Sequence, residues 1–226
     1  DLRMSRGLGD VYKRQIPAFI GHTQFARDGN KDLTGIPFRI SSMAEFHSFF
    51  GFAPTLRFGI RPEDSESEDT TNDINVLFPD GSCQLTLPKT FYALYYNMLL
   101  FYANGGGPCY IVSVGDYEHD FKSIDFTNAL LALKKEQEPT LVVVPEAVYM
   151  EEGDCYKVQT AALMHCGNDM KNRFAILDVF NGYKDENGAV IKSFRENIGS
   201  NFLAYCASYY PCLLYTSPSP RDMRRS

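Results

Sequence analysis

The strongest constraint on the fold is a regular alternation of two kinds of sequence between residues 90 and 207. Short, almost wholly apolar runs predict strands buried on both faces, at residues 109–115, 140–146 and 173–180. Longer runs with apolar residues at helical spacing predict helices at residues 90–104, 123–138, 153–167 and about 190–207. Such alternation is typical of βαβ units around a parallel sheet that is covered on both faces. The sequence therefore predicts an α/β fold with a mostly parallel sheet and helices on both faces.

The residues before this alternation predict two more strands and a short helix. IPAFIGHT (residues 16–23) and PFRI (37–40) are short apolar runs that indicate strands. In SSMAEFHSFFG (41–51) either opening serine can cap a helix, Glu45 completes the capping pattern and Gly51 ends the helix. For the later helices, the same reasoning predicts caps at Ser123 and Asp154 and an end at Gly167.

Residues 57–88 are predicted to be an insertion between core elements. RPEDSESEDTTND (61–73) is acidic and has no hydrophobic period, so an exposed loop is expected there. Two strand-like runs follow in residues 74–88, on either side of Pro79, Asp80 and Gly81. That is turn chemistry, and the pattern predicts a small β-hairpin.

The two ends of the chain resemble a translated sequencing adapter. DVYKRQ (residues 10–15) can be encoded by GATGTGTATAAGAGACAG, and the reverse complement of that string, read one base in, encodes CLLYTS (212–217). Two ends of one gene have no reason to be reverse complements in shifted frames. Residues 1–15 and 212–226 are therefore interpreted as adapter artefacts and excluded from fold reasoning. Residues 16–211 are expected to be a fragment of a longer protein.

The composition of residues 16–211 argues against some partners. This part holds 15 Lys/Arg and 25 Asp/Glu, a formal charge of −10, and it has no basic stripe. Neither nucleic acid nor an anionic membrane is therefore expected as a partner, and no apolar run is long enough for membrane insertion. The five cysteines within residues 16–211 are odd in number and irregularly spaced, which predicts reduced, mostly buried thiols: Cys83, Cys109, Cys155, Cys166 and Cys206.

Three glycines at residues 105–107, in FYANGGGPCYIVSVG, raise the question of a phosphate site. Phosphate loops run from strand through glycines to a helix N-terminus, whereas here a predicted helix precedes the glycines and a strand follows. The glycines are therefore interpreted as a helix end, with Pro108 preventing its continuation. No cofactor is expected there.

Acidic residues follow the predicted parallel strands, where α/β enzymes place their chemistry. Asp116, Glu146 and Asp178 could converge at that edge, and His119 is the candidate base nearest to them in sequence. A small α/β hydrolase or nucleotide-binding enzyme is thus an alternative reading. The sequence has no G-x-S-x-G motif and no complete catalytic set, so no catalytic residue is assigned.

Metal binding is not expected. Cys155 and His165 lie three turns apart on one predicted helix, so they and Cys166 cannot share one ion. His22 and His47 are expected to be structural. The many tyrosines and phenylalanines serve a core, and any surplus would suit protein–protein contact in a binding module, a third reading.

Long ordered stretches of residues 16–211 resemble the tail sheath proteins of contractile phage tails and of phage-tail-like extracellular contractile injection systems. They are IPAFIGHT, GIPFRISSMAEFHSFFG, LYYNMLLFYANGGGPCYIVSVGDY, KKEQEPTLVVVPEA, MKNRFAILDVFNGY, FRENIGSNFLAY and ASYYP. The resemblance implies a subtilisin-like α/β sheath domain that is not a protease and needs no cofactor.

The same resemblance implies how such a subunit works. Sheath subunits assemble in the host bacterial cytoplasm as stacked hexameric rings around an inner tube protein, with baseplate and terminator proteins at the ends. They contract and drive the tube through a target envelope. Terminal arms that pair with neighbouring sheets, and the C-terminal domain that contacts the tube, are expected to be missing from residues 16–211. This fragment alone is therefore expected to form no contractile tubes.

Overall fold

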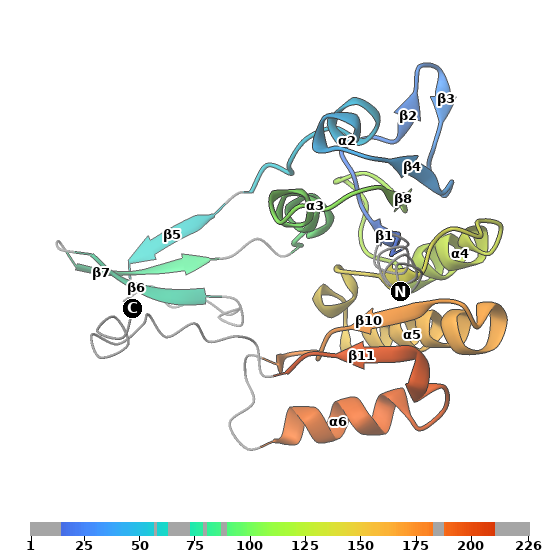
Figure 1. Ribbon diagram of the computed structural model, residues 1–226. Coiled ribbons are helices and arrows are strands. Elements are labelled where there is room, and N and C mark those ends of the chain that lie inside the picture. Colours follow the sequence, from blue (N-terminus) through green and yellow to red (C-terminus); the bar gives the residue numbers. More distant parts are fainter. Residues whose placement is uncertain are drawn as a thin grey trace, which may run out of the picture.

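One six-stranded sheet organises the chain (Figure 1). The computed structural model describes residues 15–56, 58–62, 73–78, 81–86, 90–182 and 188–210. The strands of the main sheet are β1 (Pro17–Gly21), β4 (Phe38–Ile40), β8 (Cys109–Ser113), β9 (Leu141–Val143), β10 (Phe174–Leu177) and β11 (Cys206–Ser208). Their spatial order is β11-β10-β9-β1-β8-β4, and every neighbouring pair is parallel except β4 with β8. The predicted mostly parallel α/β fold is confirmed.

Helices cover both faces of this sheet, as the doubly apolar strands predicted. Ala18 and Ile20 of β1 belong to a buried cluster with α4 (Ser123–Leu133) and α5 (Glu152–Met164). Phe19, between them in β1, belongs to a second cluster with α2 (Met43–Phe50) and α3 (Leu94–Ala103). Successive side chains of a strand point to opposite faces, so β1 packs against a helical layer on each side.

The short helix α2 has the predicted caps. Ser42 is the N-cap, and its hydroxyl accepts a hydrogen bond from the backbone N–H of Glu45 at 3.2 Å. The Glu45 carboxylate in turn accepts from the backbone N–H of Ser41 at 2.6 Å. Gly51 ends the helix with φ of 84°, a left-handed value that a glycine adopts without strain.

The three glycines after α3 form a helix end, as predicted. The backbone N–H of Gly105 donates to Tyr102 O at 3.1 Å, and that of Gly106 donates to Phe101 O at 2.9 Å. This pair of bonds, with φ of 84° at Gly105, is a Schellman motif, which satisfies the last carbonyls of a helix. Gly106 allows close approach, because a Cβ there would lie 2.7 Å from Phe101 O. The chain then enters β8 directly.

Several predicted boundaries are wrong. The helix predicted over residues 90–104 begins at Leu94. Ser123 is the first residue of α4 and donates to the Asp154 carboxylate at 3.0 Å instead of capping its own helix. Asp154 lies in the first turn of α5 and binds Ser123 and Lys157, while Glu151 is the cap position.

Gly167 does not end the helix that contains it. The chain continues from α5 into a π-helical turn, η2 (His165–Met170). A Cβ at Gly167 would lie 2.4 Å from the Phe202 Cβ, so the glycine serves close packing instead. The helix predicted over about 190–207 is also wrong in its second half: α6 (Ala189–Ile198) is followed by η4 (Leu203–Tyr205) and the edge strand β11.

The insertion contains the predicted hairpin and one strand more. β6 (Asp73–Phe78) and β7 (Gly81–Thr86) pair antiparallel up to Phe78 and Gly81, and β5 (Gly59–Pro62) joins β7 on its other side. A two-stranded ribbon, β2 (Arg27–Asp28) and β3 (Lys31–Asp32), was not predicted. Most of the acidic loop, residues 63–72, and the turn residues 79–80 lie outside the described residues.

The predictions about the chain ends and the cysteines concern residues that the structure describes only in part. Residues 1–14 and 211–226, nearly all of the proposed adapter sequence, lie outside the described residues. Cys109, Cys155 and Cys166 are free and buried, and Cys206 is free and half-buried, as predicted. Within the described ranges, no helix is both long and apolar enough to cross a membrane.

The helix end after α3 allows a direct test with a matched control. We expect Gly106→Ala to lower the free energy of unfolding by about 1–3 kcal/mol, because overpacking against a backbone oxygen forces the chain to shift. Gly107→Ala should change it little, since nothing lies within 4 Å of an added Cβ there. Urea unfolding of the full chain, followed by circular dichroism, measures both. Equal losses in the two variants would contradict the assignment.

Candidate functional site

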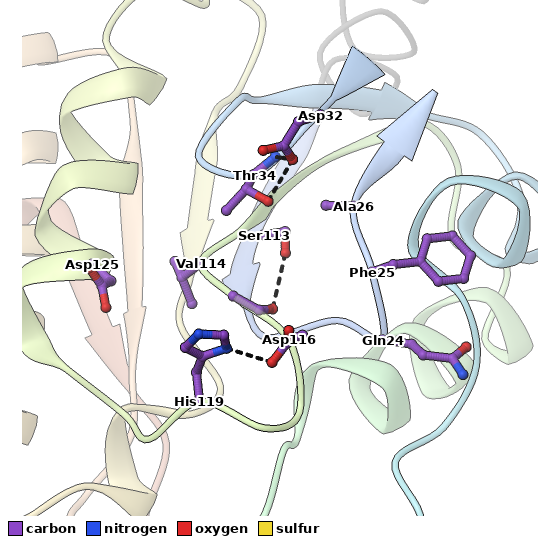
Figure 2. Close-up of a pocket in the computed structure, with 11 residues that line it drawn as sticks. Gln24, Phe25, Ala26, Asp32, Thr34, Ser113, Val114, Asp116, His119 and Asp125 are labelled. Carbon is purple, nitrogen blue, oxygen red and sulfur yellow. Dashed lines mark hydrogen bonds and ion pairs between the residues drawn. The ribbon is translucent and has the colours of Figure 1, made fainter. Parts of the chain in front are cut away.

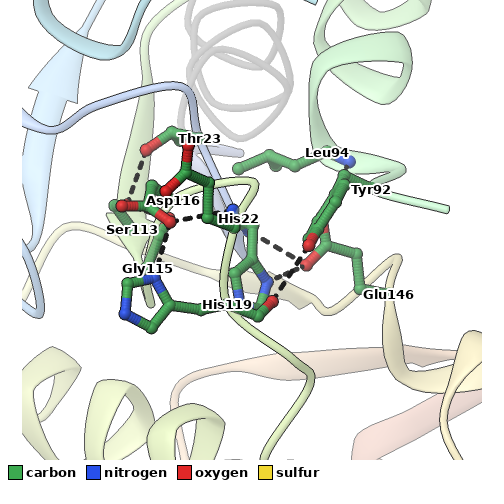
Figure 3. A network of polar contacts seen from close by, with 10 residues as sticks. His22, Thr23, Tyr92, Leu94, Ser113, Gly115, Asp116, His119 and Glu146 are labelled. Carbon is green, nitrogen blue, oxygen red and sulfur yellow. Dashed lines mark hydrogen bonds and ion pairs between the residues drawn. The ribbon is translucent and has the colours of Figure 1, made fainter. Parts of the chain in front are cut away.

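The candidate site lies at the carboxyl ends of the three central strands β1, β8 and β9. Parallel strands end at one edge of a sheet, so the residues that follow them meet there although they are far apart in sequence. His22 and Thr23 follow β1, Asp116 and His119 follow β8, and Glu146 follows β9 (Figure 3). The loops are joined by backbone bonds, from Thr23 N to Gly115 O at 3.0 Å and from Val114 N to Gly21 O at 3.0 Å.

Glu146 is the centre of this edge, with 0 % of its surface exposed. Its Oε2 accepts from the backbone N–H of His22 at 2.9 Å and lies 2.8 Å from His22 Nδ1. Its Oε1 accepts from the backbone N–H of Leu94, the first residue of α3, at 3.3 Å. Since α3 has no side-chain cap of its own, the carboxylate also supplies the negative charge that a helix N-terminus favours.

Three aromatic rings pack around His22. The ring centroids of Tyr92, Phe121 and Phe126 lie 5.3, 5.0 and 5.7 Å from that of His22. Burial raises the pKa of Tyr92, and the charges of Asp120, Glu146 and Asp116 raise it further. His22 and Glu146 are thus sealed from solvent, and a substrate could reach neither without an opening of the fold.

Thr23 and Ser113 form a second buried contact beside this pair. Thr23 Oγ1 donates to Phe25 O at 2.9 Å and lies 2.6 Å from Ser113 Oγ. Ser113 Oγ is also 3.3 Å from Gly115 O. Both hydroxyls are therefore used to hold the ends of β1 and β8 together.

Asp116 and His119 form the solvent-exposed part of the site. His119 Nδ1 lies 2.5 Å from Asp116 Oδ1, and the histidine side chain is 64 % exposed. The backbone N–H of Glu118 and then the His119 ring lower the pKa of Asp116. Tyr92 Oη donates to His119 O at 3.0 Å and so ties this loop to the buried layer.

An open depression of about 470 Å³ lies in front of Asp116 and His119 (Figure 2). Gln24, Phe25 and Thr34 line it from the segments after β1 and β3, together with the carboxylates of Asp32 and Asp125. Asp32 is held by Thr34, whose backbone N–H donates to it at 2.9 Å and lowers its pKa. The depression is thus acidic and has His119 as its one basic lining residue among those described.

The three carboxylates named from sequence do not converge. Glu146 is buried on His22, Asp116 faces the depression, and Asp178 follows β10, where its backbone carbonyl accepts from Gln159 Nε2 at 2.7 Å. The Asp178 residue is exposed overall. Protein atoms displace part of the water around its carboxyl group, and this desolvation raises the pKa. His119, the candidate base nearest in sequence, contacts Asp116, but no arrangement joins all three acids.

The other two histidines, His47 and His165, contact side chains outside the depression, and for His47 a structural position is the predicted one. His47 stacks on Phe52 and hydrogen-bonds Tyr95 Oη at 3.1 Å. His165 contacts Arg173, away from the site. Over the ranges that the structure describes, no three His, Cys, Asp or Glu side chains are grouped to hold a metal ion.

Sequence reasoning missed the contact between His22 and Glu146, which are 124 residues apart. The available signal was that each follows a predicted strand of the same parallel sheet. In the comparisons with known proteins, no protein-family model matches the chain and no curated protein gives a significant match.

The buried carboxylate allows a quantitative test. Glu146→Ala leaves three N–H groups without their acceptor, and each buried unpaired donor costs about 1–3 kcal/mol. We therefore expect the variant to lose at least about 3 kcal/mol of unfolding free energy. Glu196→Ala is the control, because its exposed pair with Lys192 should contribute less than about 1 kcal/mol. Similar losses in chemical denaturation of the two variants would argue against a central role for Glu146.

Proposed function

We propose that this chain is a structural subunit of a contractile tail sheath, from a phage tail or a phage-tail-like injection particle. The support comes first from the resemblance in sequence. The resembling stretches coincide with the core of the fold: IPAFIGHT contains β1, the glycine-containing stretch contains all of α3 and β8, and KKEQEPTLVVVPEA contains β9. A likeness that follows the central strands and the residues after them concerns the fold itself and not an isolated motif.

The structural observation that carries the proposal is the edge of the main sheet. β11 is the outermost strand on one side and pairs with β10 alone among the described strands. Tyr209, directly after it, is 78 % exposed. A short strand with an unpaired edge can accept a strand from another chain through backbone hydrogen bonds. In a sheath this edge would receive an arm of a neighbouring subunit.

The proposed partners follow from this role. They are further copies of the subunit in stacked hexameric rings, the inner tube protein, and the baseplate and terminator proteins at the ends of the sheath. Assembly would take place in the host bacterial cytoplasm, and the finished particle would carry the subunit. The acidic composition of residues 16–211 argues against nucleic acid as a further partner.

One observation favours a second candidate, an α/β hydrolase. Asp116 and His119 form an exposed pair in an open depression at the carboxyl edge of the sheet, which is the usual place for chemistry in such folds. His119 would be the general base and Asp116 would orient it. Glu146 and Asp178 have no part in this pair, so the alternative now rests on two residues.

The sheath proposal is tested by recovering the reading frame of the source DNA beyond both ends of residues 16–211. We expect that frame to add a further domain and terminal arms, and its purified product to form long tubes in negative-stain microscopy. The present 226-residue chain is the matched control and should form none. A completed frame without a further domain, or a product that stays monomeric at assembly concentrations, would refute the proposal.

The hydrolase candidate is tested on the same purified chain with a panel of ester and phosphoester substrates. An enzyme that uses the exposed pair should lose at least about a hundredfold in turnover on His119→Gln, the usual contribution of general base catalysis. His47→Gln is the control, since that ring stacks on Phe52 outside the depression. We expect no turnover that depends on His119, and turnover with that dependence would favour the enzyme.

A further inference from the structure

A buried arginine and a buried histidine meet at the end of the sheet where β10 begins. Arg173 and His165 are each 2 % exposed. Arg173 Nη1 donates to Leu133 O at 2.9 Å and lies 2.9 Å from His165 Nε2. Its Nη2 donates to Glu136 O. One side chain therefore satisfies two carbonyls at the end of α4 and also contacts the π-helical turn η2.

The chemistry of this contact fixes the state of the histidine. A guanidinium has only donors and stays protonated, so His165 Nε2 must accept the hydrogen bond. The ring is then neutral, with its proton on Nδ1. Burial, and then the charge of Arg173, lower the pKa of His165 from 6.5 to about 4.

Other contacts also hold this segment, among them the burial of Cys166 of η2 in the core cluster. A salt bridge of 2.6 Å from Lys134 Nζ to Asp169 Oδ2 also joins the end of α4 to η2. Gly167 of η2 packs directly on Phe202, which lies just before η4 and the edge strand β11. An outward movement of η2 would therefore remove the surface on which Phe202 packs.

We propose that the contact between His165 and Arg173 is an acid-sensitive latch, which holds η2 and the β11 edge closed and opens locally when the histidine is protonated. Protonation at Nε2 would place an N–H against the Arg173 N–H and two positive charges side by side in a buried position. Arg173 would then lose its hydrogen bond to Nε2 and would lie beside a charged histidine instead of a neutral one. This latch does not rest on the proposed sheath role.

The charged groups around the latch shift the pKa of His165 in opposite directions. Asp169 favours the protonated histidine, whereas Arg173 and Lys134 oppose it. The negative charge of Glu136 favours the charged form of Arg173. Burial raises the pKa of the Cys166 thiol to about 12, so this neighbour stays uncharged in the range considered.

The direction of the pH effect follows from linkage. The closed form binds a proton less readily than the open form, in which His165 has its ordinary pKa of 6.5. The closed form is therefore fully favoured above that value and loses stability as the pH falls toward about 4, where both forms are protonated. Local opening is expected to become roughly twentyfold more frequent from about pH 7 to about pH 5.

Hydrogen–deuterium exchange of the full chain, corrected for the intrinsic pH dependence of exchange, tests the latch. Peptides from residues 165–182 and 200–210 should lose about twentyfold in protection over that pH interval, while the central strand β8 should lose much less. His165→Gln supplies a carbonyl oxygen that can accept from Arg173 at every pH, so the local loss should disappear. His47→Gln, the control, should keep it.

Two results would overturn the latch. One is a protection loss that is equal in β8 and in the η2 and β11 peptides, because the acid effect would then be global. The other is a local loss that persists in the His165→Gln variant. If that variant does not fold, the regional comparison in the unmodified chain decides the matter, since an absent or uniform acid effect there contradicts a local opening.

Discussion

The buried carboxylate of Glu146 is the interaction on which the arrangement of the central layers depends. It accepts hydrogen bonds from the end of β1 and from the first turn of α3, and it belongs to the loop after β9. A carboxylate in such a position is stable only when its oxygens are saturated by donors, which restricts where all three segments can lie. The start of α3 is thereby set against the middle strand of the sheet. Tyr92, just before α3, then closes the same layer over His22.

At the opposite end of the sheet, a buried side chain of opposite charge, Arg173, also satisfies the end of a helix. Helix ends leave backbone groups unsatisfied, with partial positive charge at the N-terminus and partial negative charge at the C-terminus. Glu146 brings an anion to the start of α3, and Arg173 brings a cation to the last carbonyls of α4. Each comes from a distant part of the chain. The two buried charges therefore connect secondary structure to tertiary structure, while the exposed pair of Asp116 and His119 is free to meet solvent.

Local sequence patterns predicted those elements whose cause is local. The caps of α2 and the glycines after α3 depend on residues within one helical turn, so their signals were sufficient. The failures have long-range causes. Gly167 looked like a helix end, but it is required by contact with Phe202, and the helix continues past it. The helix predicted over about 190–207 runs into β11, because residues there form a strand only by pairing with β10. The third strand of the insertion was missed for the same reason.

The sequence by itself determined the α/β class, the layers on both faces and the position of acidic residues after the parallel strands, because hydrophobic period and turn chemistry are local properties. Only the tertiary structure decided which of those residues meet. In the folded protein Glu146 contacts His22 and Asp116 contacts His119, while Asp178 belongs to neither pair. The physical reason is that strand order and register, which no local pattern contains, bring β1 between β8 and β9. The pairing of polar side chains at the sheet edge follows from that order.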